Sequence, residues 1–375
     1  MGWIMQRLDT LIDGLAETYS ATEEGLSLFR ILFALSFVFI ATPRFLWAAE
    51  YPDLFWNPPL PLSLLDCEGI VQIGIVCGFP SYWVTVALEA SLALTVVFLL
   101  FGYRTFHASI LFTIFYIALN AFRYSFGKID HGILFVITPA ILAFSGWGNH
   151  FSLDAKQGRT TSQSYPAYCL LFLALSVGMG FLAAGLPKAI HWVDFDLSTS
   201  GVRGWVVHNY FANGRTNYLA PVFAHTSNVY FWEGMDYAAV LFEVGLALSV
   251  LRAWAFKRFL VLAVFFHIAN YLMLNIGFIV NFPVYAAFLP WPSVSGWVKK
   301  SKKSEITNNI ITYNYFYVFC SVYTVVYLFN LVENIPYISA VKKFSIYGLS
   351  ILVVMCLVVS KVKRDERPLL GAVAS

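Results

Sequence analysis

The chain has 375 residues, of which 59% are hydrophobic and 12% are charged, and its net charge is +3. A soluble domain usually carries about 25% charged residues, so this composition favours a membrane protein over a soluble one. The small net charge, with no basic tract interleaved with aromatic residues, argues against a partner that is a nucleic acid.

The first residues predict a helix that lies on the membrane rather than across it. Apolar residues between positions 3 and 15 recur near helical spacing, with polar residues between them. Such a helix buries one face at the boundary between headgroups and acyl chains. We therefore expect residues 1–22 to form an interfacial amphipathic helix, with the lipid bilayer as its partner.

Apolar stretches of spanning length dominate the rest of the chain. A transmembrane helix needs about 20 mostly apolar residues. The stretch 277–292 is short and contains Asn281 and Pro283, so it is a span, a half-helix or a re-entrant piece, and nine spans is the alternative to ten. The sequence predicts an all-α fold, a polytopic transmembrane helical bundle of about ten spans: 25–47, 81–102, 105–122, 129–146, 167–187, 236–253, 257–275, 277–292, 312–332 and 344–361.

The distribution of Lys and Arg predicts the orientation of the bundle. With both termini cytoplasmic, the inner segments hold 15 of the 24 Lys and Arg residues and the outer segments hold 8, while Arg30 stays inside the first span. This excess agrees with the positive-inside rule. We expect a main transmembrane domain over 23–295, a Lys-rich cytoplasmic linker over 296–311, and a C-terminal hairpin with a basic tail over 312–375.

Several polar residues lie inside apolar runs, where they are energetically costly, and two cysteines lie in a loop that is predicted to be outside the membrane. Arg30, Glu243 and His267 lie inside apolar runs, where such groups are either paired to lock helices together or line a cavity. Cys67 and Cys77 share one outer loop, and they form either a disulfide or two free thiols. No Cys or His spacing matches a compact metal motif, so we expect no metal.

Five local patterns, in this order, carry a resemblance to a known family. The patterns are GLSLFRILFAL at 25–35, GKIDHGILF at 127–135, FSLDA at 151–155, FLAAGLPKAIHW at 181–192 and FFHIANYLMLNIGF at 265–278. On these patterns the chain resembles the HTTM family, the horizontally transferred transmembrane domain, which includes the membrane core of vitamin K-dependent γ-glutamyl carboxylase. The resemblance covers roughly residues 20–295.

The resemblance implies an enzyme that works with a reduced quinone, such as vitamin K or menaquinone. Carboxylase members of the family epoxidise the quinone and carboxylate a peptide Glu. Lys188 stands where the family has its catalytic base, and His131 stands where a supporting histidine is found, beside Asp130. The resemblance also implies a multi-pass protein of the bacterial cytoplasmic membrane.

The chain departs from the carboxylase in two respects. Pro187 precedes Lys188 where the carboxylase has a second lysine, and no large propeptide-binding domain follows residue 295. Smaller bacterial relatives include a membrane protein that is needed to mature a sporulation-delaying peptide toxin, and this chain is nearer to that size.

Each candidate residue also has a structural interpretation. Lys188 either acts as a base or extends to the headgroups from a helix end. His131 either supports the same chemistry or caps its helix. Two functions therefore stay open. One is a carboxylase-like or quinone-epoxidase-like enzyme at the outer face. The other is a non-enzymatic factor that binds a small exported peptide or a partner membrane subunit, for maturation or immunity.

Overall fold

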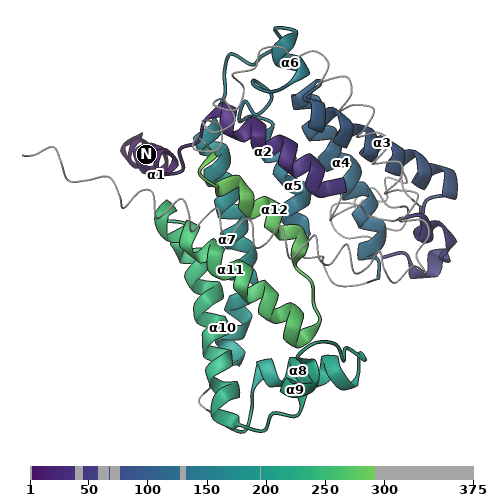
Figure 1. The fold of residues 1–375 in the computed structure, drawn as a ribbon, viewed down its shortest axis with the longest axis vertical. Helices are drawn as coiled ribbons and strands as arrows, with labels where there is room; N and C mark the ends of the chain where they lie inside the picture. The colour runs from purple at the N-terminus through teal and green to yellow at the C-terminus, as the bar shows by residue number, and fades with distance from the viewer. Residues whose placement is uncertain are drawn as a thin grey trace, which may run out of the picture. The chain divides into compact units, whose positions relative to one another are not determined.

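A computed structural model of the chain describes residues 2–38, 45–57, 67, 77–126, 132–194 and 196–291 (Figure 1). All regular elements in these ranges are helical, mostly α-helices with short 3-10 helices, and none of them is a strand. The described residues divide into two compact units, each described by itself: unit 1 holds those up to residue 20 and those within 167–289, and unit 2 holds those within 21–166 together with residues 290 and 291.

Unit 2 is a set of helices packed on an aromatic core. Phe33 is central to it, since its ring stacks on that of Phe135 with centroids 4.3 Å apart and meets the ring of Phe112 edge-on. Helix α2 begins where the side chain of Thr22 accepts a hydrogen bond from the backbone N–H of Gly25. The elements are α2 Glu23–Ser36, η2 Leu46–Glu50, η3 Asp53–Phe55, α3 Tyr82–Phe101, α4 Thr105–Tyr124, α5 Ile133–Leu142 and α6 Leu153–Lys156.

Unit 1 is built on three long helices, α7, α10 and α11, with α10 packed against both of the others (Figure 1). Two short helices, α8 and α9, pack on each other and on α11, and α8 also packs on α10. The elements are α1 Gly2–Thr18, α7 Pro166–His191, α8 Gly201–Phe211, α9 Ala220–Ala224, α10 Val229–Ser249, α11 Ala253–Leu274, η5 Ile279–Asn281, α12 Phe282–Tyr285 and η6 Ala286–Phe288.

The N-terminal helix α1 is tied to unit 1 near its end. The hydroxyl of Tyr19 donates to the carbonyl of Val250 at 2.6 Å, and the hydroxyl of Tyr168 donates to Asp13 at 2.5 Å. Burial raises the pKa of Tyr19 above its ordinary value, so its hydroxyl keeps the proton that it donates. The apolar residues Leu8 and Leu11 remain exposed on α1.

Four of the described helices are long and apolar enough to cross a membrane: α3, α4, α7 and α11. They coincide closely with four predicted spans. Helix α10 starts seven residues before its predicted span, because the side chain of Asn228 caps it by accepting from the N–H of Phe231. Within the predicted segment 277–292, residues 279–288 form three short helical pieces, and 312–332 and 344–361 lie outside the described residues.

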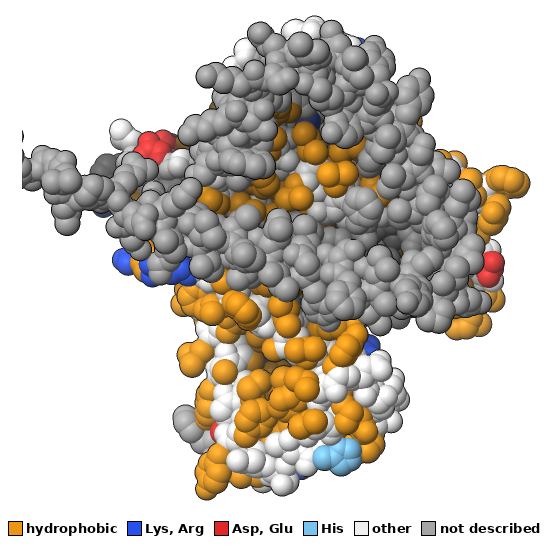
Figure 2. Space-filling view, viewed as in Figure 1, with side chains coloured by type: hydrophobic (Ala, Val, Ile, Leu, Met, Phe, Trp, Pro, Cys, Tyr) orange, Lys and Arg blue, Asp and Glu red, His pale blue; other side chains and the backbone are white. Residues whose placement is uncertain are grey.

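The long helices of unit 1 expose large apolar side chains, while three carboxylates of α10, those of Glu233, Asp236 and Glu243, are buried. Figure 2 shows hydrophobic side chains over much of the visible surface of unit 1. Leu241 on α10 is 72% exposed, whereas Glu243, two residues on, is only 3% exposed. A soluble bundle would show the opposite arrangement, since large exposed apolar areas are rare on soluble monomers. The described helices therefore fit a membrane protein, whose lipid-facing surface is apolar.

The turn between α3 and α4 makes a stability prediction. Gly102 has φ +63°, and a Cβ there would come within 2.0 Å of Nη1 of Arg30, a side chain that is fully buried. The left-handed conformation alone costs a non-glycine residue about 1–2 kcal/mol. Gly102→Ala adds this collision to the backbone strain. It should therefore lower the thermal unfolding temperature of the detergent-solubilised protein by more than a variant that introduces the backbone strain alone.

Gly158→Ala is the matched control. Gly158 has φ +66°, but a Cβ there would meet nothing within 4 Å. It introduces the same backbone strain without the collision. Equal melting temperatures for the two variants would show that the contact between Gly102 and Arg30 contributes nothing.

Candidate functional site

Two glycines bring α7 and α10 into close contact. A Cβ on Gly178 would come within 2.7 Å of the side chain of Val250, and a Cβ on Gly185 within 2.8 Å of the Cβ of Glu243. Small residues let helix backbones approach in membranes, where packing rather than the hydrophobic effect drives association. The spacing of seven residues, two helical turns, puts both glycines on one face of α7.

Lys188 continues this face of α7 and forms an ion pair with Glu243. The ammonium Nζ donates to Oε1 of the carboxylate, and the Nζ also lies 5.3 Å from the centre of the Trp192 ring. The lysine side chain is 25% exposed and that of Glu243 is 4% exposed. Pro187 lies inside α7 and does not end the helix before Lys188. The cation is thus held between a buried carboxylate and an aromatic face.

His267 on α11 lies in an aromatic surrounding within the same unit. Its Nε2 and the hydroxyl of Tyr285 form a hydrogen bond of 2.9 Å, and its ring stacks on that of Phe278 with centroids 4.6 Å apart. Phe181 of α7 contacts both His267 and Phe242, the neighbour of Glu243 in sequence. A layer of aromatic rings therefore connects the histidine to the helices that carry the ion pair.

Asp236 fixes the short helix α8 to α10. Its buried carboxylate accepts hydrogen bonds from the backbone N–H groups of Gly201 at 3.1 Å and Val202 at 2.7 Å. A carboxylate at a helix N-terminus accepts from N–H groups that have no partner within the helix, and its negative charge interacts favourably with the positive end of the helix dipole. Trp192 lies against Gly201, where a Cβ would come within 2.3 Å of the indole Nε1. The ion pair and the start of α8 are thus connected through Trp192.

Unit 2 holds a second group of buried charges. Arg30 donates from Nη2 to the carbonyl of Phe151 at 2.6 Å. Asp154 accepts from the backbone N–H groups of Arg104 and Thr105, and from the Thr105 hydroxyl at 2.8 Å. The sequence fragments 25–35 and 151–155 therefore meet here, with Asp154 capping α4. Its role is structural, since all of these contacts hold backbone segments together.

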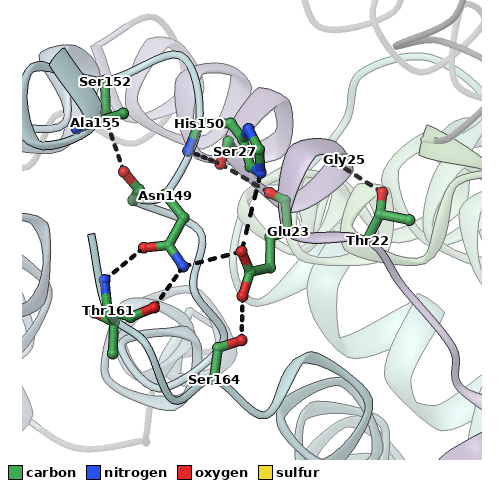
Figure 3. Close-up of polar contacts among 11 residues, drawn as sticks. Thr22, Glu23, Gly25, Ser27, Asn149, His150, Ser152, Ala155, Thr161 and Ser164 are labelled. Atoms are coloured by element: carbon green, nitrogen blue, oxygen red, sulfur yellow. Dashed lines mark hydrogen bonds and ion pairs between the residues drawn. The ribbon is translucent and has the colours of Figure 1, made fainter. Parts of the chain in front are cut away.

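A polar cluster at the start of α2 ties the loop after α5 in place (Figure 3). Glu23 accepts from Ser164 through Oε1 and from Asn149 through Oε2, the second at 2.9 Å, and His150 Nε2 lies 3.9 Å from Oε2. Asn149 also exchanges two hydrogen bonds with the backbone of Thr161. These contacts join the start of α2 to residues 149–164.

The structure brings together some of the predicted residues and not others. Lys188 and Glu243 form one pair, while Arg30 belongs to unit 2. His131 and Asp130 lie outside the described residues. Cys67 and Cys77 are joined by a disulfide, with their Cα atoms 5.1 Å apart. Among the described residues, no group of three or more His, Cys, Asp or Glu side chains could hold a metal ion.

Sequence reasoning missed Asp236 and Trp192. Asp236 lies seven residues before Glu243 and so on the same face of α10, which was a usable signal. Nothing in the sequence indicated that its partners would be the N–H groups of α8.

Comparison with known families, with characterised proteins and with solved structures finds no match to this chain.

The cap that Asp236 provides makes a local prediction. In Asp236→Asn one oxygen becomes an amide N–H group that cannot accept from the α8 backbone, which should cost about 1–3 kcal/mol. The segment before α10 should then open more often, and trypsin should cleave after Arg203 and Arg215 faster than in the wild type. The fragments can be measured by mass spectrometry.

Asp9→Asn on α1 provides the same chemical change at an exposed position. It should leave the cleavage rate unchanged. If Asp236→Asn is cut no faster than this control, the contact does not hold α8 in place.

Proposed function

We propose that the chain is a multi-pass membrane protein of the HTTM, vitamin K-dependent γ-carboxylase-like class. It would use a reduced quinone at the outer face of a bacterial cytoplasmic membrane to modify a peptide or a lipid-soluble substrate. Lys188 would be the base that takes the proton from the quinone's hydroxyl group. The observation that carries the proposal is the pairing of Lys188 with the buried carboxylate of Glu243.

The pair supplies what a base at a membrane edge needs. An amine acts as a base only when it has lost its extra proton, and the carboxylate beside Lys188 can receive that proton over a single hydrogen bond. A lysine that simply extended to the headgroups would need no buried acceptor. The ion pair therefore favours the chemical role of Lys188 over the anchoring one.

The surroundings of the pair fit a lipid-soluble aromatic ring. Phe181 and Phe242 pack edge-on with centroids 5.6 Å apart in the same helices, and Trp192 presents its ring to Lys188. A reduced quinone, when bound, would supply a ring hydroxyl and the reducing equivalents for reaction with oxygen. The chain's own residues would orient the hydroxyl and accept its proton.

A second function, a non-enzymatic factor for an exported peptide, is favoured by a different surface. Residues on or next to α8 and α9 expose large apolar side chains: Trp205, Phe211, Tyr218, Leu219 and Val222. Such a surface could hold a small exported peptide or a partner membrane subunit for maturation or immunity. This function would not require proton transfer by Lys188, so the two functions can be separated experimentally.

An epoxidation assay tests the enzymatic function. Purified protein incubated with reduced menaquinone or vitamin K under oxygen should form the quinone epoxide, which mass spectrometry detects. Lys188→Ala should abolish it, because removing a general base costs about 10²–10⁴-fold in rate.

Lys156→Ala serves as the control, since Lys156 is an exposed lysine on α6 and should be replaceable without effect. Epoxide formation that persists in Lys188→Ala would remove this lysine from the mechanism. Folded wild-type protein that forms no epoxide would shift the function to the binding of a peptide or partner subunit.

A further inference from the structure

The two oxygens of Glu243 differ in their surroundings. Oε1 accepts from Lys188, whereas Oε2 is buried and has no hydrogen-bond partner. A carboxylate oxygen that is removed from water without a partner is unfavourable, and native proteins rarely leave one so. Oε2 is therefore a buried hydrogen-bond acceptor on the same carboxylate that pairs with the ammonium of Lys188.

The proton balance of the pair assigns a role to this carboxylate. Lys188 as an ammonium has no lone pair and cannot accept a proton. A hydroxyl group can lose its proton to Oε2 directly, or to Lys188 after the lysine has passed its own proton to Glu243. Both routes end in the same state, with a neutral Glu243 carboxyl group and a charged Lys188 ammonium.

We propose that Glu243 is the final proton acceptor of the site and that Lys188 stabilises the oxyanion left on the ligand. In this step the O–H bond of the ligand breaks, the proton goes to Glu243, and the electron pair stays on the ligand oxygen facing the ammonium. The inference rests on the proposed function and names a residue that the resemblance did not assign.

The charges of the site define the class of ligand. The carboxylate of Glu243 would repel an anion, and the ammonium of Lys188 would repel a cation. A neutral ligand is therefore favoured. The ring of Trp192 and the apolar outer surface of α7 favour a lipid-soluble aromatic ligand. A neutral phenol combines these properties with a weakly acidic hydroxyl. Lys188, a flexible and partly exposed side chain, is the group that would move to admit it.

Proton transfer can be observed without oxygen or turnover. The probe is 1-naphthol, which has one ring hydroxyl and whose phenolate absorbs at longer wavelength than the phenol. At neutral pH free naphthol is protonated. Wild-type protein in detergent should bind it and produce the absorption spectrum of the phenolate.

Three variants assign the signal. Glu243→Gln should lose the phenolate spectrum because it lacks the acceptor, and Lys188→Met should lose it because it lacks the cation. Glu233→Gln, the same change on the same helix at another buried carboxylate, should keep it. Circular dichroism and thermal unfolding would verify that each variant is folded.

Absence of phenolate in the wild type, or its persistence in Glu243→Gln, would overturn the inference. Phenolate that depends on Glu243, in a protein that forms no quinone epoxide, would support this proton-accepting site and reject the oxygenase function. The naphthol experiment therefore tests proton acceptance by Glu243, and the epoxide assay tests the oxygenase function, so that one proposal can fail while the other holds.

Discussion

A charge inside an apolar helix bundle is costly unless a specific partner meets it, and in this chain several such contacts join the helices. Removal of an ion from water costs several kcal/mol even in relaxed proteins. Glu243 meets Lys188 between α7 and α10, and Asp236 meets the N–H groups of α8. In unit 2, Arg30 meets the carbonyl of Phe151. Each of these three contacts thus connects two segments that are distant in sequence.

Close backbone approach is the second requirement, because these polar contacts act over a short range. Gly185 admits the Cβ of Glu243 one turn before Lys188, so the carboxylate can reach the ammonium. Gly201 admits the ring of Trp192, and Gly102 admits the guanidinium of Arg30. In all three places a side chain would displace a charged or aromatic group. The glycines are therefore part of the electrostatic arrangement as much as of the packing.

The sequence predicted the four long apolar helices because spanning length and hydropathy are local properties. It also identified Glu243 as costly in an apolar run. It could not name the partner of Glu243, since pairing depends on which helices are neighbours and on how each is rotated about its axis. The pair with Lys188 required the approach at Gly185, which no local pattern specifies. The start of α10 at Asn228 depended on a side-chain cap within polar sequence, where hydropathy gives no signal.

The difference in exposure within the ion pair has a chemical consequence. Lys188 is partly accessible in the last turns of α7, while Glu243 lies behind it. A ligand of the kind proposed would therefore meet the cation first and reach the carboxylate once the lysine has moved aside. Trp192, fixed against Gly201 at the start of α8, limits where the lysine can go. The cap by Asp236 holds α8 and so holds this boundary. Access to the buried acceptor would thus depend on how firmly α8 is fixed to α10, which connects the stability of a short helix to the chemistry proposed for the pair.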